Sequence, residues 1–90
     1  MTVKFFATFR QLTGEESRRV DSSPATAGEL FRALSGRYGP AFEAAVFDDG
    51  RLSETVIILV NGRNLHFTGG LDTPLGADDE VSVFPMVAGG

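Results

Sequence analysis

The residues with the clearest chemical use are the last two of the sequence, Gly89 and Gly90, at the end of the stretch FPMVAGG. A glycine pair has no side chains, so it can enter a channel that is too narrow for other residues. The group available for reaction there is the carboxylate of Gly90. A carboxylate is ionised at neutral pH and is a poor electrophile, so its chemistry requires activation from outside, for instance by adenylation. An acyl-adenylate then accepts sulfide, a thiol or an amine.

The chain contains no cysteine. It therefore has no disulfide, no thiolate metal site and no persulfide of its own. If the protein carries sulfur, a thiocarboxylate at Gly90 is the route open to it. The absence of cysteine permits this interpretation without requiring it.

The remaining reactive side chains favour structural interpretations. His66 is the single histidine, and a lone strand histidine is more often a solvated surface residue than a catalyst. Asp78, Asp79 and Glu80 are consecutive, so their side chains point to alternating faces and indicate a solvated turn rather than a metal site. No glycine motif has the spacing of a phosphate-binding loop. We therefore expect no metal site and no bound cofactor.

Length and charge restrict the class of protein. Ninety residues with 42% hydrophobic content suit one domain. The net charge of −4 would repel a phosphate backbone, which argues against nucleic acid as a partner. The sequence has neither an apolar run long enough to span a bilayer nor the pattern of a signal peptide, so we expect no membrane partner and a cytoplasmic protein.

Two segments that alternate as strands each carry an apolar residue on their polar face. In the first, residues 3–9, Val3, Phe5, Ala7 and Phe9 share one face, and Phe6 lies on the other with Lys4, Thr8 and Arg10. In the last strand, which begins at Glu80, Val81 and Val83 share a face, and Phe84 lies on the opposite one with Ser82. Pro85 lacks a ladder donor and is expected to end the pairing. Phe6 and Phe84 are thus predicted to be exposed.

The segments between these strands predict one main helix and three further strands. Residues 16–21 form a polar strand, and a capping-box pair, Thr26 and Glu29, opens a helix that ends at Gly39-Pro40. Residues 41–47 add a short helix. Residues 55–60 form a buried strand, which the turn Asn61-Gly62 joins to a strand over residues 63–67. This order indicates an α+β domain with one main helix on one face of a small sheet.

The whole chain resembles the small sulfur-carrier proteins of ubiquitin-like β-grasp fold, in particular the small subunit of molybdopterin synthase (the MoaD group) and its relatives of the thiamin pathway. The matching stretches are VKFFATFRQLTG, TAGELFRAL, ILVNGRNLHFTGGLDTPL and DDEVSVFPMVAGG. The family often has a second proline where this chain has Met86, which should alter the stiffness of the tail without touching its chemistry. The stretch FTGGLDTPL also resembles sulfur carriers of cysteine biosynthesis and archaeal members of the group.

The resemblance implies a β-grasp domain over residues 1–85, with a mixed sheet of about five strands and one main helix. Residues 86–90 would form a flexible tail. An ATP-dependent activating enzyme, similar to ubiquitin-activating enzymes, would adenylate Gly90, and a sulfur donor would convert it to the thiocarboxylate. The carrier would then deliver sulfur to a pterin precursor in the catalytic large subunit of molybdopterin synthase, or to another sulfur-accepting enzyme. It would act as a carrier subunit rather than as an independent catalyst.

The resemblance also implies which residues meet these partners. Val87, Ala88 and Gly89 would contact the partner as part of the tail. An aromatic patch on the globular part would dock on the partner as well. Phe6 and Phe84 match the patch positions of the family. Leu65 and Phe67 are the candidates to complete it, and Phe67 is the one we include among the partner-binding residues.

Two other classes of function stay open. In one, the protein is a ubiquitin-like modifier that is joined through Gly90 to lysines of other proteins. Lys4 is its only lysine, so chains of the modifier could grow only from that side chain or from the N-terminal amine. In the other, the protein is a binding module with the same fold and no acyl chemistry.

Overall fold

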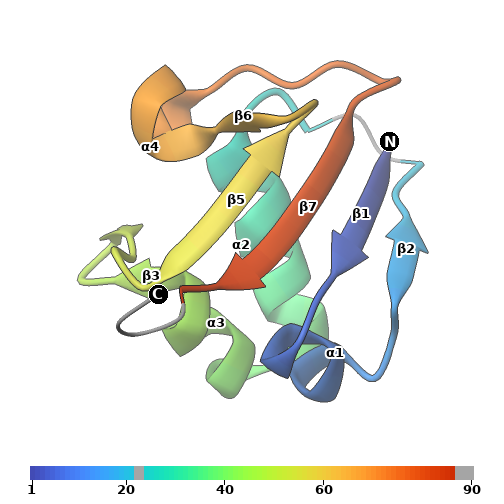
Figure 1. The fold of residues 1–90 in the computed structure, drawn as a ribbon, viewed down its shortest axis with the longest axis vertical. Helices are drawn as coiled ribbons and strands as arrows, with labels where there is room; N and C mark the ends of the chain where they lie inside the picture. The colour runs from blue at the N-terminus through green and yellow to red at the C-terminus, as the bar shows by residue number, and fades with distance from the viewer. Residues whose placement is uncertain (22–23, 87–90) are drawn as a thin grey trace.

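A mixed sheet with helices against one face is the frame of the molecule (Figure 1). The computed structural model describes residues 1–21 and 24–86. The five strands lie in the order β2-β1-β7-β5-β6, and their bounds are Thr2–Phe5 (β1), Ser17–Arg19 (β2), Val56–Val60 (β5), Arg63–Asn64 (β6) and Glu80–Pro85 (β7). The terminal strands β1 and β7 are parallel neighbours, and the other pairs are antiparallel. The predicted α+β class, mixed sheet and main helix are confirmed.

The first strand is shorter than predicted. It ends at Phe5, and helix α1 (Thr8–Thr13) follows after a turn at Ala7, whose φ is 53°. The expectation that Ala7 shares the buried face is wrong, because Ala7 is exposed. Phe9 is buried as predicted, but it lies on helix α1 and not on a strand. Leu12, three residues later on the same side of that helix, also packs against the core. A short run such as FFATFRQL fits both the strand period and the helix period, so the pattern alone could not place the boundary.

The predicted main helix is present as α2 (Ala27–Tyr38). The Thr26 Oγ1 accepts a hydrogen bond from the Glu29 N–H at 3.3 Å, and the Glu29 Oε2 accepts one from the Ala25 N–H at 2.6 Å. The first bond satisfies a backbone donor that the first turn leaves free, and the second satisfies the N–H of the residue that precedes the cap. Helix α3 (Pro40–Val46) follows after Gly39, whose φ of 99° suits glycine.

Two hairpins lie between α3 and the last strand. Strands β3 (Phe47–Asp48) and β4 (Arg51–Leu52) flank a turn at Asp49 and Gly50, both of which have positive φ. Strands β5 and β6 meet at Asn61 and Gly62, both with positive φ, as a type I′ turn requires.

The strand predicted over residues 63–67 is mostly wrong. Strand β6 covers only Arg63–Asn64, and helix α4 (Leu65–Thr68) follows it. The Asn64 side chain accepts a hydrogen bond from the His66 N–H at 2.9 Å, which starts a helical turn, and Leu65 turns into the core. A 3₁₀ turn, η1 (Gly70–Asp72), comes next.

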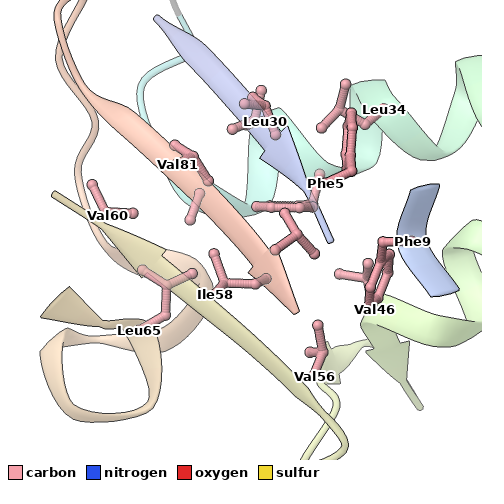
Figure 2. Close-up of a cluster of buried hydrophobic side chains, with 14 of the residues drawn as sticks. Phe5, Phe9, Leu30, Leu34, Val46, Val56, Ile58, Val60, Leu65 and Val81 are labelled. Carbon is pink, nitrogen blue, oxygen red and sulfur yellow. The ribbon is translucent and has the colours of Figure 1, made fainter. Parts of the chain in front are cut away.

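The core lies between the sheet and the helices (Figure 2). Side chains from β1, β5 and β7 meet those of α2 and α3, and the fully buried ones include Phe5, Phe31, Phe42, Ile58 and Val83. The centroid of the Phe42 ring lies within 6.4 Å of the ring centroids of Phe5, Phe9 and Phe31. Each such side chain stabilises the fold by about 1.5–3 kcal/mol relative to an exposed one. None of the helices in the described part of the chain is long and apolar enough to cross a membrane.

Pro85 does not end the pairing of the last strand as predicted. It lies in β7 opposite Val56, and the Met86 N–H still donates to the Thr55 carbonyl at 2.8 Å. Alternation directs the nitrogen of Pro85 away from β5, toward the side where β1 has already ended at Phe5. The proline therefore costs no ladder hydrogen bond.

Candidate functional site

The face of the sheet opposite the helices carries a strip of apolar side chains. Along β5 and β7, Val56, Ile58, Val81 and Val83 point into the core, so their sequence neighbours point outward. Ile57 pairs with Phe84 across the ladder, and Leu59 pairs with Ser82. We call the four partly exposed residues Phe6, Ile57, Leu59 and Phe84 the outer-face patch.

The two phenylalanines of this patch are stacked. Their ring centroids are 4.4 Å apart and the ring planes differ by 8°. Phe6 follows the end of β1, and its N–H donates to the Val83 carbonyl at 3.1 Å, which holds the ring beside Phe84. The predicted outer-face position of both residues agrees with this geometry. Both residues are only partly exposed, since each ring covers part of the other.

Arg10 gives the patch a positive rim. Its guanidinium carbon lies 5.7 Å from the centroid of the Phe6 ring, within the range of a cation–π contact. Its Nε donates to the Phe5 carbonyl at 3.1 Å, so the side chain is tied to the end of β1. Sequence reasoning placed Arg10 on a strand face and missed this role, because α1 was not predicted.

Phe67 lies apart from the stack. It is on α4, which packs at the β5–β6 edge of the sheet, and its side chain is 87% exposed. Leu65, the other residue considered for the patch, is fully buried and cannot contact a partner. Phe67 therefore adds a separate apolar contact point at the edge of the molecule, away from the Phe6–Phe84 pair.

The base of the C-terminal segment is fixed next to the patch. The Met86 N–H bonds to the Thr55 carbonyl, and Thr55 is held in turn by the Ser53 Oγ, which accepts the Thr55 N–H at 3.1 Å. The Ser53 N–H donates to the Val46 carbonyl at 2.8 Å. Residues 87–90, which include the predicted Val87, Ala88, Gly89 and Gly90, lie outside the described residues. The segment thus starts from an anchored point two residues after Phe84.

Two of the reactive side chains that the sequence offered, those of His66 and Asp79, have structural partners. The exposed His66 lies with its Nε2 3.1 Å from the Val56 carbonyl. The Asp79 carboxylate accepts hydrogen bonds from the Gly76 N–H and the Asn61 Nδ2, and these bonds, the first above all, lower its pKa. Within residues 1–21 and 24–86, no three histidine, aspartate or glutamate side chains are placed to hold a metal ion.

Comparison with known proteins identifies the group to which this arrangement belongs. The family model described as the ThiS family matches residues 3–90. The chain belongs to the ThiS family. The match includes both the strands that bear the outer-face patch and the closing Gly-Gly.

Two relatives within this group have names that indicate different roles. Small archaeal modifier protein 3 of Haloferax volcanii is 40% identical over 92 residues, which cover 100% of this chain and 98% of the relative. Sulfur carrier protein CysO of Mycobacterium tuberculosis is 33% identical over 92 residues, with coverages of 100% and 98%. The chain is therefore a member of a family of sulfur carriers and ubiquitin-like modifiers.

A solved structure supports the fold. A Pyrococcus furiosus protein, solved as a candidate molybdopterin converting factor subunit 1, superposes with a TM-score of 0.75 at 34% identity. The match covers 96% of this chain and 95% of that one. The ubiquitin-like β-grasp fold that the sequence resemblance implied is confirmed.

Proposed function

We propose that the protein is a sulfur carrier whose C-terminal Gly90 is adenylated by an ATP-dependent activating enzyme and then converted to a thiocarboxylate. The observation that carries the proposal is the outer-face patch at the base of the C-terminal segment. A partner that binds this patch holds the chain only six residues before Gly90. Six extended residues span about 20 Å, so the partner's active site must lie within that distance of Phe84.

The proposed chemistry takes place in two steps at the carboxylate of Gly90. The Gly90 carboxylate attacks the α-phosphorus of ATP, pyrophosphate leaves, and an acyl-adenylate forms. Hydrosulfide, or the sulfur that a donor supplies at that oxidation level, attacks the acyl carbon. The C–O bond to AMP breaks and a C–S bond forms. This chain supplies the carboxylate and the docking surface, and the enzymes supply ATP binding and sulfur, since the chain has no cysteine.

We propose the large subunit of molybdopterin synthase as the sulfur acceptor. The similarity to the Pyrococcus furiosus protein and the motif DDEVSVFPMVAGG support this choice. The 33% identity to CysO makes a cysteine-forming enzyme the competing acceptor, and thiamin synthesis is the third pathway that the family resemblance admits.

Complementation separates these acceptors. The chain is expressed in three bacterial strains, each of which lacks its own carrier for molybdopterin, cysteine or thiamin synthesis. The proposal predicts restored molybdoenzyme activity in the first strain, and no rescue by a variant from which Gly90 is deleted. Rescue of the cysteine or thiamin strain alone would overturn the choice of acceptor but keep the carrier chemistry.

Conjugation to other proteins is a second candidate function, and the 40% identity to a small archaeal modifier protein favours it. An amine in place of hydrosulfide would attack the same acyl carbon and form an isopeptide bond. A tagged chain should then appear in higher-mass adducts, with Gly90 linked to lysines of other proteins. Lys4, whose Nζ lies 3.0 Å from Glu80 Oε1, is the only lysine from which a chain of modifiers could extend. Lys4→Arg serves as the control that removes chains linked through this lysine and leaves single adducts, and any chains linked through the N-terminal amine, unaffected.

A further inference from the structure

A groove runs between the edge strand β2 and helix α2, away from the outer-face patch. It has a volume of about 340 Å³ and is lined by residues of β2, of the segment after it and of α2. The lining includes Arg18, Arg19, Val20, Asp21, Ala33, Leu34 and Arg37. Figure 1 shows β2 at one edge of the sheet, with only β1 beside it.

The outer edge of β2 has unpaired backbone groups. The Glu16 carbonyl accepts the Phe5 N–H at 2.8 Å and the Val20 N–H donates to the Met1 carbonyl at 2.9 Å, so these groups face β1. Alternation then directs the N–H and C=O groups of Ser17 and Arg19 away from the sheet. In the described part of the chain no strand pairs with this side. Such an edge can accept an added strand.

The groove is positive in a chain of negative net charge. Three of the eight basic residues, Arg18, Arg19 and Arg37, line it beside one acidic residue, Asp21. Arg18 is already paired with Glu15 at 3.0 Å, so Arg19 and Arg37 are the two that a partner can use. Among the described residues Arg37 has no carboxylate within ion-pair distance, and its guanidinium lies over the ring of Tyr38, 5.9 Å from the centroid. The ion pair of Arg19 with Asp21 is 3.3 Å long, and both side chains are more than 80% exposed. Replacing Asp21 by a carboxylate of the partner therefore costs little free energy.

The sequence of β2 determines which strand can be added. A second copy of β2 would place arginine beside arginine, and like charges on neighbouring strands are destabilising. An acidic strand places carboxylates there instead. On the side of α2, the exposed Ala33 and the partly exposed Val20 leave space for an apolar side chain above the buried Leu34.

We propose that this groove binds an extended segment of a partner protein, in which aspartates and glutamates flank β-branched apolar residues, as an added strand on β2. The segment bonds to the backbone of Ser17 and Arg19, places an apolar side chain against α2 and pairs its carboxylates with Arg19 and Arg37. The outer-face patch stays free, so this partner binds at the same time as an enzyme docked at Phe6 and Phe84. The proposal does not depend on the chemistry of Gly90.

Titration of the ¹⁵N-labelled protein with a synthetic peptide tests the proposal. The peptide has a Val-Ile-Val-Ile core flanked on both sides by aspartate and glutamate. The amide signals of residues 17–19, Ala33 and Arg37 are expected to shift, while those of Ile57 and Phe84 stay unchanged. Added salt should weaken the binding because the charged rim is exposed. A matched peptide with lysine in the acidic positions should not bind. Shifts confined to the outer face, or equal binding of both peptides, would overturn the proposal.

Two pairs of variants locate the contact. Arg19→Pro and Arg19→Gln both remove the charge, but only proline removes the outward N–H, which takes no part in the ladder with β1. Arg19→Pro should bind the acidic peptide roughly fivefold more weakly than Arg19→Gln, as the loss of one hydrogen bond predicts. Arg37→Glu, on the exposed side of α2, should weaken binding roughly fivefold, and Arg51→Glu on β4 should not. Equal affinities within both pairs would refute the added strand.

Discussion

The neighbouring residues Val83 and Phe84 separate stability from docking, because they point to opposite faces of the same strand. Val83 is fully buried in the core, and Phe84 is partly exposed in the outer-face patch. Val83→Ala removes two methyl groups and leaves a cavity, which should lower the free energy of unfolding by about 2–3 kcal/mol. Phe84→Ala removes the stack on Phe6 and some half-buried surface, so its cost should be only about 1–1.5 kcal/mol.

The order is reversed for binding. If Phe84 lies at the centre of the interface with the activating enzyme, its truncation should cost about 2 kcal/mol of binding energy, or roughly a 30-fold higher Kd. Val83→Ala should bind within about twofold of the unchanged protein, because its side chain never reaches the surface. Urea denaturation gives the stabilities, and calorimetric titration with the activating enzyme gives the two Kd values. A Phe84→Ala protein that is less stable than Val83→Ala, or that binds with an unchanged Kd, would refute the assignment of the outer-face patch.

Three further predictions concern the frame that holds the patch. Hydrogen bonds from the Tyr38 hydroxyl and then Arg18 lower the pKa of Glu15 below its ordinary 4.5, so the stability they give is present above pH 4.5 and is lost as the pH falls through the lowered pKa. Urea denaturation at several acidic pH values should therefore show a flatter pH dependence for Glu15→Gln than for the unchanged protein, and identical slopes would contradict this. Thr26→Ala should lower the free energy of unfolding by about 1 kcal/mol through loss of the cap on Glu29, whereas the exposed Thr8→Ala should change it little. Gly28→Ala should lower the free energy of unfolding by about 1 kcal/mol or more, although alanine has the better helix propensity, because its Cβ would lie 3.1 Å from the Leu71 carbonyl oxygen. A rise in the thermal unfolding temperature would contradict this, since it would show that η1 moves aside without loss of stability.

Much of the fold could be predicted from local sequence patterns wherever no second pattern in the same segment favoured a different structure. The capping pair Thr26 and Glu29, the turn Asn61-Gly62 and the buried strand that precedes it each appear where the sequence indicated. The errors lie in short segments in which local capping competes with strand periodicity. At Asn64 a side-chain cap turned the expected strand into helix α4, and after Phe5 the chain turned into α1.

The candidate site was predictable in part for the same reason. An apolar residue on the polar face of a strand indicated both Phe6 and Phe84, since alternation fixes the face. The stack between them and the contact with Arg10 depend on the parallel pairing of β1 with β7 and on α1, which join segments far apart in the sequence. Alternation within one strand carries no information about such pairings, so the patch as a surface became visible only in the structure.

We propose that the carboxylate of Gly90 is the reacting group, and intact mass spectrometry is the measurement that decides it. The protein is incubated with its activating enzyme, ATP and a sulfur donor, and a protein from which Gly90 is deleted is treated in parallel. We expect the mass to rise by the difference between one sulfur and one oxygen atom, the change to map to the C-terminal peptide, and the deletion variant to show no change. An unchanged mass, in a system in which the same enzyme loads a known carrier, would contradict the role of Gly90.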